Sequence, residues 1–444
     1  MPDPHPKPLA VIHPHAAGID VHSDTHVVCT GPGQVRSFGA YTADLRDLAD
    51  HVRRAGVTAV ALESTGVYWI PLFDLLEAEG FDVKLVEPGQ LSSCGARPKT
   101  DVLDCQWIQR LHSYGLLRGS FRPPAAVRAL RTYHRLRQMV VRGAAGHVQH
   151  LQKALEQMNV KLTEVLSDIT GVSGSKIVEA ILAGERDPVA LALLASPKCA
   201  KSRAEFALAL AGTWQREHLF ELRLAYELFR GYQTRLDDCD AKLAEELARL
   251  PAKSDTPLSP KARKRGRKKN DLRFEAAAPL HRALGIDLTA IEGIDAQTAL
   301  VILAEIGVDV GAFATEKHFA SWLGLCPQTA KSNKTEKRRR VRKGSNRVKQ
   351  ALRMCAQSLG RTQTPMGAFY RRIRSRIGGR GACTATAHKL ARLVYRMLKH
   401  GAEYVAKGMA EYEAKQREQA ERNLRKRARQ LGYDLTPKAA PAPA

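Results

Sequence analysis

Hydrophobic positions in the first 124 residues alternate between short β-type runs and longer helical patterns. Apolar and β-branched runs predict strands at residues 17–21, 26–29, 57–62 and 81–86. Apolar residues spaced three and four apart predict helices at residues 44–55 and 68–79. Strands that alternate with helices are typical of an α/β sheet, so we expect an α/β domain at residues 16–124. The proline-rich stretch before it, residues 1–15, is expected to be disordered.

A long helical pattern follows the α/β region. Apolar residues recur at helical spacing from Ala126 to about Leu155, which predicts a long helix or a coiled-coil arm. Helical segments continue to Leu250, so we assign residues 125–250 to a helical arm. Prolines and then seven positive charges in the nine residues 261–269 indicate a basic, disordered linker at residues 251–275.

A second folded unit, mainly helical, is expected at residues 276–408, followed by a charged helix and a Pro/Ala-rich tail at 409–444. Within it, residues 288–300 have the pattern of a helix–hairpin–helix, in which Gly293 permits a tight turn. The helix after that turn would present backbone N–H groups to a phosphate. Residues 331–353 contain eleven Lys and Arg and one acid. That run is either a solvated surface or, beside a loop serine, a phosphate-binding face.

Charge narrows the class of protein. The 444 residues contain 70 Lys and Arg against 45 Asp and Glu, a formal net charge of +25, and 44% are hydrophobic. This excess favours a polyanionic partner over the small substrates of a metabolic enzyme. No apolar run approaches the roughly 18 residues that span a bilayer, and the mean hydropathy is −0.31. The eight cysteines form no C-x-x-C pair and the N-terminus lacks a signal peptide, so we expect a cytoplasmic protein with reduced thiols.

Four carboxylates occupy positions where a charge needs compensation. Asp20 lies inside the first predicted strand, and Glu63 ends the third. Asp101 and Asp104 are three residues apart at the start of a helical pattern, so both can point to one side. A divalent cation would compensate these charges, and oxygen ligands select Mg²⁺ or Mn²⁺, which assist phosphoryl transfer. The structural alternative is that Asp20 pairs with a lysine and that Asp101 and Asp104 cap a helix.

Three of these stretches resemble motifs of the DEDD transposases of bacterial insertion sequences: residues 18–22 (GIDVH), 61–68 (ALESTGVY) and 99–104 (KTDVLD). The resemblance implies an N-terminal RuvC-like domain of RNase H fold. It also implies that the four acids of the family correspond to Asp20, Glu63, Asp101 and Asp104, which would hold Mg²⁺ or Mn²⁺.

The C-terminal unit resembles the transposase domain of the same family at residues 324–327 (GLCP), 351–354 (ALRM), 367–372 (GAFYRR) and 386–392 (TAHKLAR). The family's nucleophilic serine lies a few residues after the Gly-Leu-x-Pro turn, which corresponds to Ser332. The family usually continues with two glycines and a lysine, whereas Asn333 and Lys334 follow here, so Ser345 is kept as a second candidate.

A protein of this kind would be a transposase that cuts and rejoins donor and target DNA through a covalent phosphoserine. The resemblance also implies guidance by a structured bridge RNA, assembly as a tetramer and a place in the bacterial cytoplasm, associated with the nucleoid. Two alternatives are a RuvC-like, metal-dependent junction nuclease and a catalytically inactive, nucleic-acid-binding relic of a transposon. The expected nucleic-acid contacts are Lys331, Lys334, Arg338, Arg339, Arg340, Arg342, Lys343, Arg347, Arg265 and Lys268.

Overall fold

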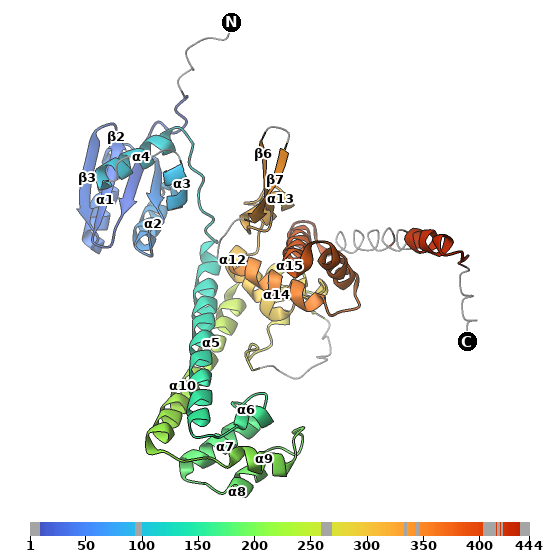
Figure 1. Cartoon of the computed structure of the whole chain (residues 1–444). Coiled ribbons are helices and arrows are strands. Elements are labelled where there is room, and N and C mark those ends of the chain that lie inside the picture. The colour runs from blue at the N-terminus through green and yellow to red at the C-terminus, as the bar shows by residue number, and fades with distance from the viewer. Residues whose placement is uncertain are drawn as a thin grey trace. The chain divides into compact units, whose positions relative to one another are not determined.

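The computed structural model describes residues 9–93, 100–258, 269–332, 335–341, 346–402, 414, 418 and 421–435. The chain divides into two compact units, with the boundary between Arg122 and Pro123 (Figure 1). The first unit contains a five-stranded sheet, and the second is mostly helical. Within the described ranges no helix is long and apolar enough to cross a membrane, and no described cysteine takes part in a disulfide.

The first unit is built on one mixed sheet with the strand order β3-β2-β1-β4-β5. Strand β1 pairs antiparallel with β2, and β2 with β3, whereas β4 lies parallel to β1 and β5 lies parallel to β4. The α/β class predicted from the sequence is confirmed, and β3 is an addition to the predicted strands. The strands are β1 (Ala16–Val21), β2 (Thr25–Gly31), β3 (Gln34–Gly39), β4 (Ala59–Glu63) and β5 (Asp82–Val86).

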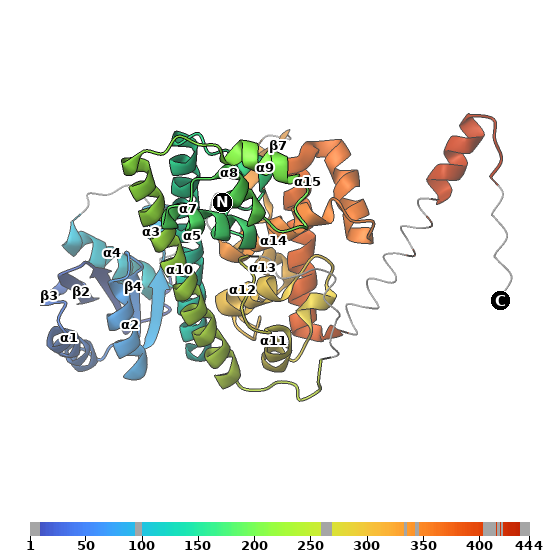
Figure 2. The same ribbon diagram turned by 90° about the horizontal axis from the view of Figure 1, so that it is seen from below.

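Helices cover both faces of this sheet (Figure 2). Helices α1 (Thr42–Arg54) and α2 (Trp69–Ala78) pack on one face, where fully buried Leu48 and Leu72 share a core with Ile19. Helix α4 (Asp101–Ser113) covers the other face, where Ile108 packs with Ala61 of β4. A short helix, α3 (Pro88–Ser93), precedes it.

Helix α4 approaches β1 most closely at Gly18. A Cβ atom at Gly18 would lie 2.2 Å from the backbone nitrogen of Gln109 and 2.4 Å from the carbonyl oxygen of Cys105. Only glycine can occupy that position without displacing the helix backbone. The side chain of Gln109 donates a hydrogen bond of 3.3 Å to the carbonyl oxygen of Ala16, at the start of β1. Helix α4 therefore runs antiparallel to β1, and its N-terminus lies at the carboxyl end of that strand.

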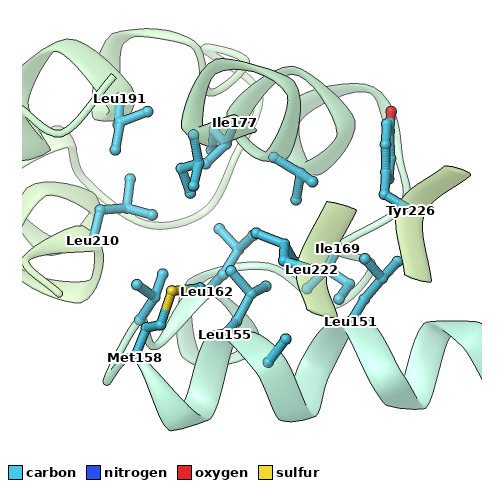
Figure 3. Packing of buried hydrophobic residues seen from close by; sticks show 14 of the residues in the cluster. Leu151, Leu155, Met158, Leu162, Ile169, Ile177, Leu191, Leu210, Leu222 and Tyr226 are labelled. Atoms are coloured by element: carbon cyan, nitrogen blue, oxygen red, sulfur yellow. The ribbon is translucent and has the colours of Figure 1, made fainter. Parts of the chain in front are cut away.

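The second unit contains two long helices, α5 (Ala125–Gln157) and α10 (Arg216–Arg249), which pack side by side (Figure 1). Four short helices gather at one end of this pair: α6 (Leu162–Val165), α7 (Val172–Ala183), α8 (Pro188–Leu193) and α9 (Arg203–Leu210). Figure 3 shows their shared core, in which Leu155 and Met158 of α5 pack with Ile177, Leu210 and Leu222. The arm therefore has a folded tip with its own apolar core.

Buried ion pairs tie α5 to its neighbours. Arg137 of α5 forms a bidentate ion pair with Asp240 of α10, with N–O distances of 2.5 and 3.1 Å. The two side chains are only 4% and 3% exposed. On α12 (Ala296–Ile306), buried Glu305 accepts hydrogen bonds of 2.9 and 2.7 Å from Arg135. Each pairing satisfies charges that would be costly to bury alone.

The remainder of the second unit is a helical bundle with one β-hairpin. Tyr395 donates a hydrogen bond of 2.8 Å to the carbonyl oxygen of Phe313, whose ring packs with those of Phe319 and Trp322. Helix α15 bends at Gly378, where φ is 77°. The helices are α11 (Ala277–Leu284), the 3₁₀ turn η1 (Leu288–Ala290), α12, α13 (Glu316–Trp322), α14 (Arg347–Leu359) and α15 (Pro365–His400), and the hairpin consists of β6 (Pro327–Ser332) and β7 (Thr335–Val341).

Three features differ from the sequence-based expectation. The first half of the predicted helix–hairpin–helix is a single 3₁₀ turn, and the carboxylate of Asp295 caps α12 by accepting from the backbone N–H of Thr298 at 2.8 Å. That carboxylate occupies the helix end that was expected to receive a phosphate. The catalytic-loop candidate Ser332 is not in a loop, because it ends strand β6. Near the ends of the range predicted as a linker, 251–275, Leu272 is buried and Lys253 Nζ donates to the carbonyl oxygen of Val308 at 2.8 Å, while residues 259–268 lie outside the described part.

Candidate active site

The two N-terminal acids lie at the same edge of the sheet. Parallel strands β1 and β4 are in register up to Ile19 and Leu62, so Asp20 and Glu63 are the next residue on each strand. Side chains two residues apart on a strand share a face. Asp20 therefore shares the face of Gly18, and Glu63 that of Ala61, and both of those residues pack against α4.

The two later acids are placed at this edge by α4. Asp101 and Asp104 lie in its first turn, and Thr100 is the N-cap, whose side chain accepts from the backbone N–H of Leu103 at 3.3 Å. The structural alternative, in which these acids cap the helix, does not describe this N-terminus. Because α4 runs antiparallel to β1, its first turn lies at the carboxyl end of β1, beside Asp20.

One histidine, His22, lies between Asp20 and Asp101. His22 Nε2 donates to Asp20 Oδ2 at 3.2 Å and lies 3.4 Å from Asp101 Oδ1. One donor atom from each of these three residues lies within 4.8 Å of the others. Asp20 is 4% exposed, whereas the side chain of Asp101 is 61% exposed. The cluster is thus buried at Asp20 and open to solvent at Asp101.

The electrostatics show that negative charge is crowded at Asp20. Burial raises the pKa of Asp20, and the nearby charges of Asp104 and Asp101 raise it further. His22 acts in the opposite direction, through its charge and its hydrogen bond. A like-charged, partly buried carboxylate group of this kind fits a divalent cation, and hard oxygen donors fit Mg²⁺ or Mn²⁺.

Ser332 lies in the second unit. Its Cα is paired with that of Thr335 across the β6–β7 hairpin, so it is the last residue of β6 before the two-residue connection to β7. Its backbone lies in a described strand, and its side chain is outside the described part. The reserve candidate Ser345 also lies outside the described residues.

Two family models match the chain on either side of the arm tip. A model of DEDD transposases, described as "Transposase", matches residues 17–160, and one described as "Transposase IS116/IS110/IS902 family" matches residues 287–371. Together they cover about half of the sequence. The chain belongs to the IS110 family of transposases. No match was found among curated proteins.

This assignment makes the protein a DNA phosphoryl-transfer enzyme, and it identifies the mixed sheet as the RNase H-like domain of a DEDD transposase. The acidic cluster around Asp20 and Asp101 lies within the first matched region, and Ser332 lies within the second. The family models end at residue 371, so the bend of α15 and everything after it lie beyond them.

The predicted nucleic-acid contacts of the transposase fall mostly on the hairpin and its flanks. Lys331, Arg338, Arg339 and Arg340 lie on β6 and β7, while Lys334, Arg342, Lys343, Arg265 and Lys268 lie outside the described residues. Arg347 is described, and it is half-buried: its Nε donates to Gln138 Oε1 of α5 at 3.1 Å and lies 3.9 Å from Glu305 Oε1. These contacts engage its guanidinium inside the unit.

His22 is the one member of this transposase's acidic cluster that sequence reasoning did not single out. The residue stands two positions after Asp20 in the same motif, which is the available signal, because alternate strand positions share a face. A histidine near an acid is common, however, and only the position of α4 brings Asp101 to the same imidazole nitrogen.

Proposed function

We propose that this transposase cuts and rejoins DNA through a phosphoserine formed at Ser332, assisted by a divalent cation held by Asp20, Glu63, Asp101 and Asp104. The observation that supports it best is that Asp20 of β1 and Asp101 of the first turn of α4 lie together with His22 at one sheet edge, where Glu63 ends the adjacent parallel strand β4. Asp20 and Asp101 come close together there although their charges repel. Such crowding is costly unless a cation compensates it.

The acids would have distinct parts in holding the cation. Asp20, as the buried member, would anchor it, and the exposed Asp101 would leave the outer side open to a DNA phosphate. Bound Mg²⁺ or Mn²⁺ supplies positive charge that stabilises the negative oxygens of a phosphate during displacement.

Ser332 would provide the nucleophile. Its hydroxyl oxygen forms a bond to phosphorus, its proton passes to a base, and the bond from phosphorus to the leaving deoxyribose oxygen breaks, so that a strand leaves with a free hydroxyl. The reverse reaction with the hydroxyl of another strand rejoins DNA and releases the serine. Because one phosphoester replaces another, no external energy source is needed for rejoining.

A trapping experiment tests the nucleophile. Wild-type protein and Ser332→Ala are incubated with Mg²⁺ and a nicked DNA substrate, and covalent adducts are digested and located by mass spectrometry. We expect a phosphoserine at Ser332 in the wild type and DNA binding without an adduct in Ser332→Ala, while Ser345→Ala remains active. An adduct at Ser345 would move the nucleophile to that residue.

The same experiment addresses hydrolysis, which the acidic cluster would support by itself. A RuvC-like junction nuclease would release free DNA ends with no protein attached and would not need Ser332. Cleavage by Ser332→Ala with ordinary free termini would therefore replace the recombinase proposal with hydrolysis. Inactive wild-type protein under all conditions would instead indicate a relic.

Guidance by a structured RNA and assembly as a tetramer are further parts of the proposal. The net charge of +25 and the basic residues of the hairpin suit more than one nucleic-acid surface. We expect protein purified with its own element to retain a defined RNA and to lose recombination after RNase treatment. Full activity of RNA-free protein would contradict guidance by RNA. Light scattering would measure the number of subunits, which we expect to be four.

A further inference from the structure

We infer that His22 is a nitrogen ligand of the divalent cation, so that this site prefers a transition metal such as Mn²⁺ more strongly than four carboxylates alone would. The inference rests on the proposed metal site at Asp20. It adds a donor of a different chemical kind to that site, and it predicts a selectivity.

The backbone position of His22 places its side chain on the same side as the acidic cluster. Residues 18, 20 and 22 alternate along β1 and its continuation, so they share the face that α4 covers. The backbone N–H of His22 donates to the carbonyl oxygen of Thr25 at 3.0 Å, which closes the turn from β1 to β2. Pairing of Val21 with His26 continues the register up to that turn. The imidazole therefore extends from a fixed backbone position.

A single atom of the imidazole lies between the two acids. Nε2 is 3.2 Å from Asp20 Oδ2 and 3.4 Å from Asp101 Oδ1, one on a strand and one on a helix. In this arrangement a proton on Nε2 is shared between carboxylates, and a cation bound by those oxygens would take the position of that proton. Nε2 would then offer its lone pair, with the imidazole proton on Nδ1.

A mixed nitrogen and oxygen set changes metal preference. Carboxylate oxygens suit Mg²⁺ and Mn²⁺ alike, whereas imidazole binds first-row transition metals better than Mg²⁺. Loss of His22 should therefore weaken Mn²⁺ more than Mg²⁺. A histidine that only orients the carboxylates would affect both metals to the same degree.

Metal titrations of the full-length protein test this assignment. We compare wild type, His22→Ala, Asp20→Asn and the control His15→Ala, which replaces an exposed histidine outside the cluster. We expect His22→Ala to weaken Mn²⁺ about tenfold or more and Mg²⁺ only a few-fold, and to remove the nitrogen coupling from the pulsed EPR spectrum of bound Mn²⁺. His15→Ala should leave both dissociation constants and the nitrogen signal unchanged.

Failure of the ligand and failure of the metal site give different results. If Asp20→Asn abolishes metal binding while His22→Ala weakens Mn²⁺ and Mg²⁺ equally, or wild-type Mn²⁺ has no nitrogen coupling, then His22 is not a ligand. If Asp20→Asn binds both metals as the wild type does, the metal site itself is wrong.

A separate observation concerns the helix at residues 421–430, which lies beyond both family models. Five of its ten residues are Lys or Arg and one is an acid. Arg422, Arg425, Lys426 and Arg429 line one surface, since they follow helical spacing. All of the helix is exposed except Ala428, which is half-buried. Several positive charges at regular spacing on one helix face suit the regularly spaced phosphates of a nucleic-acid backbone.

We propose that this arginine face binds the backbone of duplex DNA, the substrate class of the family, and anchors the transposase near its target without reading sequence. Charge complementarity carries the choice of occupant. The opposite side of the helix offers Leu424 as a large apolar residue, with Leu431 just beyond the helix end, a small surface for insertion into a membrane. Contacts to phosphates alone are expected to be salt-dependent and independent of base sequence.

The salt dependence of DNA binding by the full chain tests the arginine face. We compare the wild type with Arg422→Ala/Arg425→Ala/Arg429→Ala and with a control that removes equal charge from exposed positions elsewhere, Arg46→Ala/Arg216→Ala/Arg230→Ala. Relative to the wild type, the first triple variant should reduce the steepness of the plot of log affinity against log salt by roughly 2 to 3. It should also weaken DNA binding about tenfold or more at 0.15 M salt.

Equal slopes in the two triple variants would overturn the assignment. It would equally fail if DNA affinity stayed at the wild-type value while affinity for structured RNA, or for vesicles of anionic lipid, fell. Both outcomes would give the helix a different partner.

Discussion

The close packing of α4 on β1 makes Gly18 a sensitive point for both stability and chemistry. Replacement of Gly18 by alanine would place a methyl group 2.2 Å from the nitrogen of Gln109, 2.4 Å from the oxygen of Cys105 and 2.7 Å from the Cα of Gln109. All three are backbone atoms, so no side chain can rotate away. The helix itself must move.

The size of the effect follows from that geometry. An ordinary contact of a Cβ atom is 3.4 Å or longer, so α4 must shift by about 1 Å. Overpacking costs about 1–3 kcal/mol, and we expect the upper end because the backbone is the obstacle. For a domain of this size that cost lowers the Tm by roughly 10 °C. A shift of 1 Å at a reacting centre costs about 10²-fold in rate.

Three measurements check this prediction. Thermal unfolding gives the change in Tm, calorimetry gives the Mg²⁺ affinity, and a strand-exchange assay below the unfolding transition gives the rate. Gly89→Ala is the matched control, because Gly89 is exposed on α3 and a Cβ atom there meets nothing within 4 Å. We expect that control to resemble the wild type in all three.

A Gly18→Ala protein that unfolds within about 1 °C of the wild type and binds Mg²⁺ normally would contradict this prediction. That result would mean that α4 does not pack on β1 at this residue. If Gly18→Ala were destabilised but bound Mg²⁺ with full affinity, α4 would pack on β1 as described. Asp101 would then not depend on that packing for its place at the metal site.

Three further predictions test other parts of the structure. Burial lowers the pKa of His112 to about 4, against 6.5 when unfolded, so the folded state resists the proton. The contribution of His112 to the free energy of unfolding should be fully present above pH 6.5, and it should fall by roughly 3 kcal/mol as the pH drops to 4. In urea unfolding, His112→Phe should show a smaller loss of stability over this pH range. Asp240→Asn leaves Arg137 buried without its counter-charge, which should cost about 3–5 kcal/mol, whereas Asp238→Asn in an exposed pair should cost under about 1 kcal/mol by the same assay. Removal of divalent ions with EDTA should lower the Tm of the wild type but not of Asp20→Asn, because only a folded site that binds metal is stabilised by it.

Much of the first unit was predictable because each of its strands carries its own local signal. The buried strands β1 and β4 are mostly apolar. Asp20 is the next-to-last residue of β1 and Glu63 is the last residue of β4, so the carboxyl edge of the sheet could be located from sequence. The strand that was missed, β3, buries one residue, Phe38, and exposes most of the others. An edge strand of that kind has no apolar alternation to detect.

The hairpin of β6 and β7 was missed for a related reason. Its residues are mostly polar, so the pattern indicated a basic run without strands, and the family resemblance placed Ser332 in a loop beside that run. The first helix of the expected helix–hairpin–helix failed differently. Asp287 caps a single 3₁₀ turn at Thr289, and the chain leaves helical geometry at Ile291, which no periodicity over so few residues could reveal.

Which residues form the acidic cluster depends on tertiary structure, and the spacing of residues in the sequence does not predict it. Asp20 and Asp101 are far apart in sequence, and their motifs predict that both belong to one site without saying which atoms meet. Gly18 decides that, since the absence of a side chain lets the backbone of α4 settle against β1 and carries its first turn to the end of the strand. Once the helix is there, His22 is the residue whose nitrogen reaches both acids. A change at Gly18 should therefore alter metal selectivity as well as affinity, because Asp101 would withdraw from the imidazole while Asp20 and His22 stay on the same strand and turn.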